Sequence, residues 1–352
     1  MPPTIKDIAR EAGVSIATVS RTLNEEDGVG PVTRDRILAI SRRLNYFPNL
    51  QARSLVAQKP HALGIVIPRT SEFAFSNPYY GEILKGIEKK TRECGQFLVF
   101  SFSGEESYAR MVQHGLASGV IVLANRMDDP RVDEAWKMSV PLVLIPGNPR
   151  LPRIPSVDVN DSNGTLQAVE HLAGLGHRRM AFLNGPADSK YSVERAFGFR
   201  RGLKKKGLPF GKEMILESDF TEQGGYEGMK KFLSLSPPPT AVMVINDFSA
   251  MGALRAAKER GYGVPEDISL VGFGDVPFSS MTDPPLTTVR EPFREMGQEA
   301  AGMLLKIVHG KKLSSRHPVL PVELVIRQST APPGKKGRKV KGYASISCSR
   351  GW

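Results

Sequence analysis

Residues 4–24 read TIKDIAREAGVSIATVSRTLN and specify the fold of the amino-terminal part of this chain. Thr4 followed by Asp7 is a capping-box-like helix start, and apolar residues recur at helical spacing until Gly13 can end the helix. Ser15 can cap a second helix. Two short helices around a glycine-containing turn predict a helix-turn-helix, whose second helix fits the major groove of DNA.

The start of this second helix holds the expected DNA contacts. Ile16 and Ala17 are apolar and can contact thymine methyl groups, and Arg21 can donate two hydrogen bonds to a guanine edge. Short polar side chains nearby suit phosphates or base edges. In an open alternative, Ile16 is a core residue and Arg21 a solvated surface charge. The residues expected at DNA from this module are Thr4, Ser15, Ile16, Ala17, Thr18, Ser20, Arg21 and Asn24.

A third helix follows, with Thr33 as its expected cap and Ile37, Ile40 and Leu44 as its buried stripe. After it comes the basic segment PNLQARSL, residues 48–55. About seven residues are too few to be helical alone in water. We therefore expect this segment to become a helix only with a partner.

The runs VSIATVSRTLN and NYFPNLQARSL resemble the lactose-repressor/galactose-repressor (LacI/GalR) family of bacterial transcription regulators, and the resemblance continues to about Thr330. It implies that residues 49–60 are a hinge helix and linker, in which Leu55 wedges into the minor groove of operator DNA and kinks it. The alternative is an ordinary linker leading to Pro60. The resemblance also implies DNA contacts for Asn49, Ala52 and Arg53.

Beyond residue 61, apolar strand-like runs alternate with helix-length segments, which is typical of parallel sheets flanked by helices. There are too many runs for one compact sheet, so we expect two lobes. The runs are ALGIVIP (62–68), FLVFSFS (97–103), GVIVLA (119–124), PLVLIP (141–146), RMAFLNG (179–185), TAVMVIN (240–246) and ISLVGFG (268–274).

The predicted fold is therefore α/β, with an all-α helix-turn-helix domain and a two-lobed effector domain. The resemblance implies that the lobes are periplasmic-binding-protein-like, each with a doubly wound parallel sheet, and that ligand binds between them. The expected domains are 1–48 for DNA binding, 49–60 for the hinge, 61–330 for effector binding and dimerisation, and 331–352 for a basic, disordered tail. Within the large domain we expect an N-lobe at about 61–159 and 291–318 and a C-lobe at about 160–290 and 319–330.

Several runs end in side chains suited to a small polyhydroxylated ligand. Ligands of such sheets bind at the carboxyl ends of strands, where rings stack on C–H faces and Arg, Asn and Asp bond to hydroxyls. Arg195 could instead form a surface salt bridge, Phe220 could pack in the core, and Asp247 could cap a helix. The expected effector-binding residues are Tyr79, Tyr80, Asn160, Asp161, Arg195, Phe220, Asn246, Asp247, Gly274 and Asp275.

The segment GFGD, residues 272–275, departs from the family pattern, because related repressors often place an acid where Gly274 stands. A missing carboxylate removes a hydrogen-bond acceptor worth about 1 kcal/mol and widens a pocket. We therefore expect a ligand other than a simple monosaccharide, such as an oligosaccharide, and we expect Asp275 to brace its loop.

Composition bounds the class of protein. The chain has 352 residues and a net charge of +12, of which six positive charges lie in residues 331–352, where there is no acid. This tail is either a solvated end or an extra phosphate contact. The two cysteines, Cys94 and Cys348, are far apart, which suits a reducing compartment. No apolar run is long enough for a membrane helix or a secretory signal, so we expect a cytoplasmic, nucleoid-associated protein.

The prediction is a transcriptional repressor that binds a palindromic operator as a homodimer and responds to a sugar or oligosaccharide. The tail shows no Leu heptads, which favours a dimer over a tetramer. The main alternative is a sugar-binding receptor without a DNA-binding role. An enzyme is not expected, because the chain has no GxGxxG after a strand, no P-loop and no HExxH, and its histidines, such as His171 and His177, are isolated. No cofactor or metal is expected either.

Overall fold

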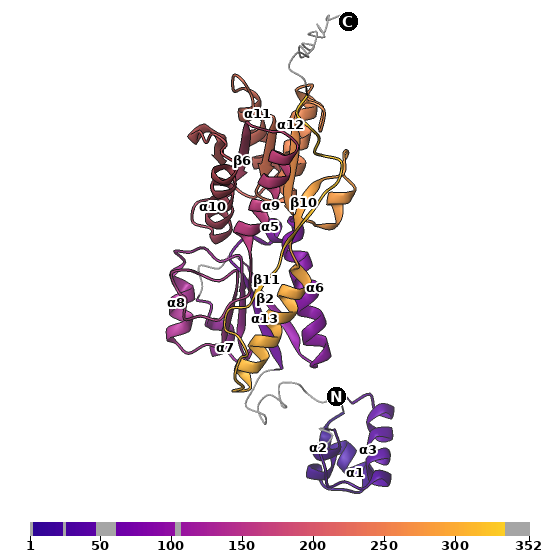
Figure 1. The fold of residues 1–352 in the computed structure, drawn as a ribbon. Coiled ribbons are helices and arrows are strands. Elements are labelled where there is room, and N and C mark those ends of the chain that lie inside the picture. Colours follow the sequence, from indigo (N-terminus) through magenta and orange to yellow (C-terminus); the bar gives the residue numbers. More distant parts are fainter. Residues whose placement is uncertain (1–2, 24–25, 47–60, 103–106, 335–352) are drawn as a thin grey trace, which may run out of the picture. The chain divides into compact units, whose positions relative to one another are not determined.

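The fold is described from a computed structural model for residues 3–23, 26–46, 61–102 and 107–334 (Figure 1). The chain divides into two compact units, residues 1–61 and residues 62–352. The predicted hinge and linker at 49–60, the DNA contact Asn24 and the tail beyond residue 334 lie outside the described residues. No described helix is long and apolar enough to cross a membrane.

The first unit consists of α1 (Ile5–Ala12), α2 (Ile16–Leu23) and α3 (Pro31–Arg43). The predicted capping box is confirmed: the Thr4 amide donates to Asp7 Oδ2 at 2.9 Å, and the N3 amide bonds to the Thr4 side chain. Gly13 ends α1 with φ of 63°, a conformation that favours glycine. These local signals fix the helix-turn-helix turn.

The core of this unit is a small apolar cluster that includes Ile8, Val19, Ile37 and Ile40. Ile16 is 45% exposed, so its interpretation as a core residue is wrong. The predicted cap of the third helix was also wrong. The helix begins at Pro31, two residues before Thr33, because proline fixes the backbone angle that a first helical residue needs and lacks the amide that would go unpaired.

The described residues of the second unit form two large sheets, one in each lobe, as the number of apolar runs predicted, and a third sheet of only two short strands. The N-lobe sheet is parallel, in the order β2 (Phe97–Phe102), β1 (Ala62–Ile67), β3 (Val120–Leu123) and β4 (Leu142–Ile145). The helices of this lobe are α5 (Ser71–Ser76), α6 (Pro78–Glu93), α7 (Arg110–Gln113), α8 (Pro130–Lys137) and α13 (Phe293–Val308). Figure 1 shows α13 beside α6, although the two are far apart in sequence.

The C-lobe sheet has six strands, in the order β12 (Glu323–Val325), β10 (Thr287–Arg290), β9 (Ser269–Gly274), β8 (Ala241–Val244), β6 (Met180–Asn184) and β7 (Ile215–Glu217). All neighbours are parallel except β10 and β12. The helices of this lobe are α9 (Asp161–Gly174), α10 (Lys190–Lys205), α11 (Glu222–Leu233) and α12 (Asp247–Glu259), with 3-10 turns η1 (Lys212–Met214) and η2 (Pro277–Ser280). The short strands β10 and β12 were not among the predicted runs.

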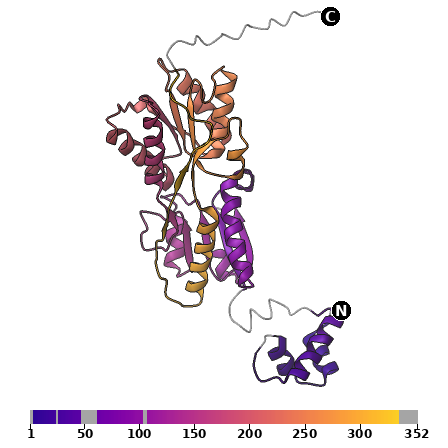
Figure 2. The ribbon, with the colours of Figure 1, turned by 45° about the vertical axis from the view of Figure 1, so that its right-hand side comes forward.

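The chain passes between the lobes before α9, between β10 and α13, and again after α13 (Figure 2). Two of these segments pair as β5 (Asp158–Val159) and β11 (Val319–Leu320), and the third leads from β10 into α13. The carboxyl ends of β3 and β6 are followed by segments that meet at the boundary between the lobes, where the Met127 amide donates to the Asp188 carbonyl at 2.9 Å. This boundary is where a ligand could touch both lobes.

Candidate effector pocket and DNA-binding helix

The proposed DNA-reading helix presents Ile16, Ala17 and Arg21 to solvent. The Ser15 hydroxyl accepts from the Thr18 amide at 3.1 Å and lies 2.8 Å from the Thr18 hydroxyl, so it caps α2. Ser20 is half-buried. The exposed residues at the start of α2 are therefore two apolar side chains and one guanidinium, the types that read thymine methyls and guanine edges.

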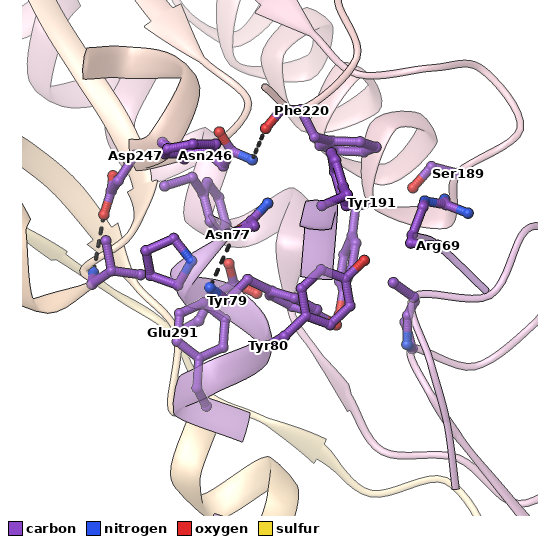
Figure 3. A pocket seen from close by; sticks show the side chains of 18 of the residues that line it. Arg69, Asn77, Tyr79, Tyr80, Ser189, Tyr191, Phe220, Asn246, Asp247 and Glu291 are labelled. Carbon is purple, nitrogen blue, oxygen red and sulfur yellow. Dashed lines mark hydrogen bonds between the residues drawn. The ribbon is translucent and has the colours of Figure 1, made fainter. Parts of the chain in front are cut away.

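A pocket lies between the two lobes and is lined by residues of both (Figure 3). It holds about 690 Å³ of atom-free space, counting its opening to solvent. Six of the predicted effector residues line it: Tyr79, Tyr80, Arg195, Phe220, Asn246 and Asp247. The N-lobe contributes the start of α6, and the C-lobe contributes α10 and the start of α12.

Two tyrosines join the lobes inside this pocket. The Tyr79 hydroxyl, at the start of α6, lies 2.9 Å from the Tyr191 hydroxyl of α10. Tyr79 also packs edge-on against Tyr80 and Phe293, with ring centroids 5.0 and 5.4 Å apart. Burial raises the pKa of Tyr80 to about 12 and that of Tyr79 well above its ordinary value, so both hydroxyls stay neutral. Tyr80 is the core residue of the pair.

Arg195 is held by three acceptors at the floor of the pocket. Its Nε donates to Asp161 Oδ1 at 2.6 Å, Nη1 to the Ile245 carbonyl at 2.6 Å, and Nη2 to Glu291 Oε2 at 2.9 Å. Its guanidinium lies 3.5 Å from the centre of the Phe273 ring. A guanidinium has five N–H groups, so two remain for a ligand. Arg195 is 3% exposed, which excludes the surface salt bridge considered for it.

The Arg195 cluster, defined as Arg195, Asp161 and Glu291, places two buried carboxylates against one guanidinium. Burial raises the pKa of both acids, against the opposing effect of Arg195, and the pKa of Glu291 reaches about 7. Burial also acts to lower the pKa of Arg195, but the two carboxylates raise it overall. Glu291 Oε1 is buried and has no hydrogen-bond partner among the described residues. Glu291 lines the pocket and was not predicted from the sequence.

Phe220 and Asn246 form one wall of the pocket. Asn246 caps α12, accepting from the Ser249 amide at 2.7 Å, and its side-chain amide donates to the Phe220 carbonyl at 3.3 Å. Phe220 has a φ of 69°, which is uncommon for a bulky residue. Its ring lies over Gly185, where an added Cβ would come within 2.6 Å of the ring atoms. Gly185 therefore allows Phe220 to reach its position.

Asp247 lines the pocket but is bonded to its own lobe. It accepts from the Ser279 hydroxyl at 2.6 Å, the Thr288 hydroxyl at 2.5 Å and the Val276 amide at 3.1 Å. Burial raises its pKa, while these hydroxyls lower it. Asp247 thus ties the start of α12 to β10 and to the loop after β9.

Four predicted effector residues do not line the pocket. Asn160 is exposed and caps α9, accepting from the Asn163 amide at 3.1 Å, while Asp161 acts through Arg195. Asp275 pairs with Arg290 at 2.7 Å and Arg327 at 2.6 Å, so it braces its loop as expected. Gly274 has φ of 132°, a backbone conformation that disfavours any L side chain, so the backbone explains why glycine stands at this position.

Several other residues line the pocket but were not predicted from the sequence. Asn77 caps α6 and is buried, and Phe273 and Phe293 are core aromatics whose edges reach the pocket. Arg69 and Ser189 also line it. A search for polar residues directly after each apolar run could have found Arg69, which follows β1 by two positions. The described residues contain no group of three or more His, Cys, Asp or Glu that could hold a metal.

Replacing Glu291 with Gln should change how stability depends on pH. Because the folded pKa of about 7 is above the ordinary 4.5, the folded protein loses stability relative to the unfolded chain as pH rises from about 4.5 through 7. Glu291→Gln removes this loss, so at pH 8 we expect a gain of about 1–3 kcal/mol over the parent, and no gain at pH 4.5. Urea unfolding at both pH values measures the difference. The exposed Glu323→Gln is the control, and equal pH slopes in the parent and Glu291→Gln would refute the assignment.

Comparisons with known proteins identify families and proteins that are similar to this chain. Residues 4–49 match the model "Bacterial regulatory proteins, lacI family", and residues 169–330 match "Periplasmic binding protein-like domain". The transcriptional regulator DegA of Bacillus subtilis (strain 168) is 32% identical over 340 residues, covering 94% of this chain and 99% of its own.

Two solved structures share the whole architecture. The lac repressor dimer bound to operator and the anti-inducer ONPF has a TM-score of 0.80 and 30% identity, over 94% of this chain and 100% of the other. The complex of the transcriptional regulator CelR with cellobiose has a TM-score of 0.72 and 30% identity, over 93% of this chain and 99% of the other. These relatives are regulators of transcription rather than enzymes.

Proposed function

Since this chain belongs to the lacI family of bacterial regulatory proteins, we propose that it is a transcriptional repressor whose hold on a palindromic operator is set by a carbohydrate bound between its lobes. The helix-turn-helix module supplies the contact with double-stranded DNA. One such module makes few base contacts, and a two-fold homodimer matches a palindromic site. The protein acts in the cytoplasm, at the nucleoid, because its partner is there.

The observation that carries this proposal is a pocket shared by both lobes in a chain that also has a DNA-reading helix. A ligand there contacts Tyr79 in the N-lobe and Arg195, Phe220 and Asn246 in the C-lobe, so it favours one relative arrangement of the lobes. Effector binding then biases whether the hinge at 49–60 forms on DNA. CelR binds cellobiose and the lac repressor complex holds ONPF, which supports a carbohydrate or related ligand here.

The proposed site divides into two sets of residues. Ligand contact is proposed for the six predicted lining residues, with Glu291 added, and Asp161 and Asp275 act as supporting residues. DNA contact is proposed for the exposed start of α2 and, outside the described residues, for Asn24, Asn49, Ala52, Arg53 and Leu55. The division at residues 1–48, 49–60 and 61–330 remains our proposal for the functional units. We further propose that the pocket binds its ligand without transforming it.

The proposal is tested by gel-shift titration of the full chain on palindromic duplexes, with and without each member of a carbohydrate library. Thermal-shift screening against the same library identifies ligands first, because a compound selective for the folded state raises the melting temperature. We expect at least one carbohydrate to raise the melting temperature and to change duplex affinity. A library in which nothing does both would refute the proposed control by carbohydrate.

Replacing Arg21 with Ala should weaken operator binding by about 1–3 kcal/mol and relax the base preference at one operator position. Arg21 is exposed on α2, where a guanidinium can pair with a guanine edge. Fluorescence anisotropy on a set of single-base operator variants measures both effects. Arg201→Ala, an exposed change in the C-lobe, is the control. Equal losses on every duplex would mean that Arg21 contacts phosphate rather than a base.

A further inference from the structure

One side of the pocket carries a cation that forms no salt bridge with a carboxylate of the described residues. Arg69 follows β1, is half-buried, and donates to the Pro68 carbonyl at 2.6 Å. Burial lowers its pKa, while the charge of Asp188 acts to raise it. Asp188 is already ion-paired with Arg126, and no described carboxylate forms a salt bridge with Arg69. The guanidinium therefore lines the pocket with N–H groups that remain available.

Ser189 lies on the same side of the pocket, and its hydroxyl is also available to a ligand. It is 6% exposed and lines the pocket, and within the described parts of the chain its hydroxyl makes no hydrogen bond. It stands at the N-cap of α10, yet its side chain makes no capping bond to the helix. Buried hydroxyl groups normally have a hydrogen-bond partner, and a ligand in the pocket can supply the one that Ser189 lacks.

The start of α10 adds the positive end of a helix dipole to this corner. The helix is 16 residues long, and amides in the first turn of a helix have no intrahelical acceptor. Figure 3 shows Arg69 and Ser189 together on one side of the pocket, with Asp247 and Glu291 on the other. A guanidinium, a hydroxyl and helix amides are the groups that bind oxyanions in proteins.

The opposite side of the pocket is acidic. Asp247 and Glu291 both line it, and Glu291 Oε1 is the buried carboxylate oxygen left without a partner in the described structure. A ligand hydroxyl can donate to that oxygen. The pocket thus has a free acceptor for hydroxyls on the side where Glu291 pairs with Arg195, and the guanidinium of Arg69 on the other side.

We propose that the effector is a carbohydrate bearing an acidic group, and that Arg69, the Ser189 hydroxyl and the first amides of α10 bind that group. This inference rests on the proposed carbohydrate site and names its ligand class. A phosphate and a carboxylate share the oxyanion chemistry that this corner recognises, whereas a neutral sugar offers Arg69 and Ser189 only uncharged acceptors, which form weaker hydrogen bonds.

The test is isothermal titration calorimetry of the full chain with matched sets of sugars. Each set contains a neutral sugar, its 6-phosphate and its uronic acid, built on glucose, cellobiose and maltose. We expect at least one anionic member to bind about 10-fold or more tightly than its neutral parent, and the phosphate and uronate arms identify which oxyanion is preferred.

Two variants assign the effect to this corner. Arg69→Gln should weaken the anionic probe about 10-fold or more while changing the affinity of the neutral parent less than about 2-fold, and Ser189→Ala should weaken the anionic probe several-fold. Arg92→Gln, on the exposed face of α6, is the matched control. Melting temperatures of all variants show that each is folded.

The outcomes separate the two proposals. If neutral sugars bind and no anionic probe binds more tightly, the acidic ligand is refuted while the carbohydrate site stands. Equal weakening of neutral and anionic probes by Arg69→Gln also refutes it. If no member of any set binds, both proposals fail.

Discussion

Replacing Arg195 with Met is expected to lower the free energy of unfolding at pH 7.5 by about 3–5 kcal/mol. The change leaves the buried carboxylates of Asp161 and Glu291 without their cation, and it removes a donor to the Ile245 carbonyl. An uncompensated buried charge costs far more than a lost surface ion pair. Urea unfolding followed by circular dichroism measures the difference.

The loss should be reversed by removing the charges that Arg195 neutralises. The triple variant Arg195→Met, Asp161→Asn, Glu291→Gln keeps similar volumes without any buried charge, so it should regain most of the lost stability. Arg201→Met changes an exposed residue on the same helix and should alter stability by less than about 0.5 kcal/mol. A single variant within about 1 kcal/mol of the parent, or a triple variant no more stable than the single one, would contradict the described network.

Deleting residues 1–61 should abolish specific operator binding, with a loss of about 1,000-fold or more in affinity. Those residues form a compact unit of their own, which holds every described residue proposed to read DNA. The pocket lies wholly in the second unit, so the truncated protein should bind carbohydrate as tightly as the full chain does without DNA. Anisotropy with an operator duplex and calorimetry with the sugar give the two affinities.

A point variant provides the matching control for this deletion. Gly13→Val places a β-branched residue at φ of 63°, in the turn between α1 and α2, and should weaken DNA binding strongly in an otherwise complete chain. Operator affinity that survives the deletion would show that the second unit contacts DNA by itself. In that case the helix-turn-helix would not be the reading element.

The amino-terminal fold was predictable because its signals are local. Thr4, Asp7 and Gly13 specify where α1 begins and ends, whatever the rest of the chain does. The strands β1, β3 and β4 were predictable for the same reason, since each is a continuous apolar run buried on both faces. The strand β12, of three residues, has too little pattern to stand out, and it pairs with a neighbour distant in sequence.

The pocket was only partly predictable, because some of its polar residues follow strands that the sequence reveals, whereas others are brought together only by the arrangement of the two lobes. Asn246 follows a strand and begins a helix, a position that sequence can identify. Glu291 follows β10, which was not predicted, so nothing marked it as a pocket residue. Arg69 and Ser189 come from different lobes, and their meeting depends on how the lobes close. Sequence alone identifies side chains at strand ends but not the pairs formed across lobes.

Occupancy of the pocket between the lobes should change the affinity of the helix-turn-helix for operator DNA. The most direct measurement is the operator dissociation constant of the full chain, at fixed salt, with no sugar and with a saturating amount of the sugar found by screening. We predict a change of about 5- to 150-fold, and by linkage the sugar's affinity must change by the same factor when operator is added. Identical operator dissociation constants at zero and saturating sugar would contradict the claim.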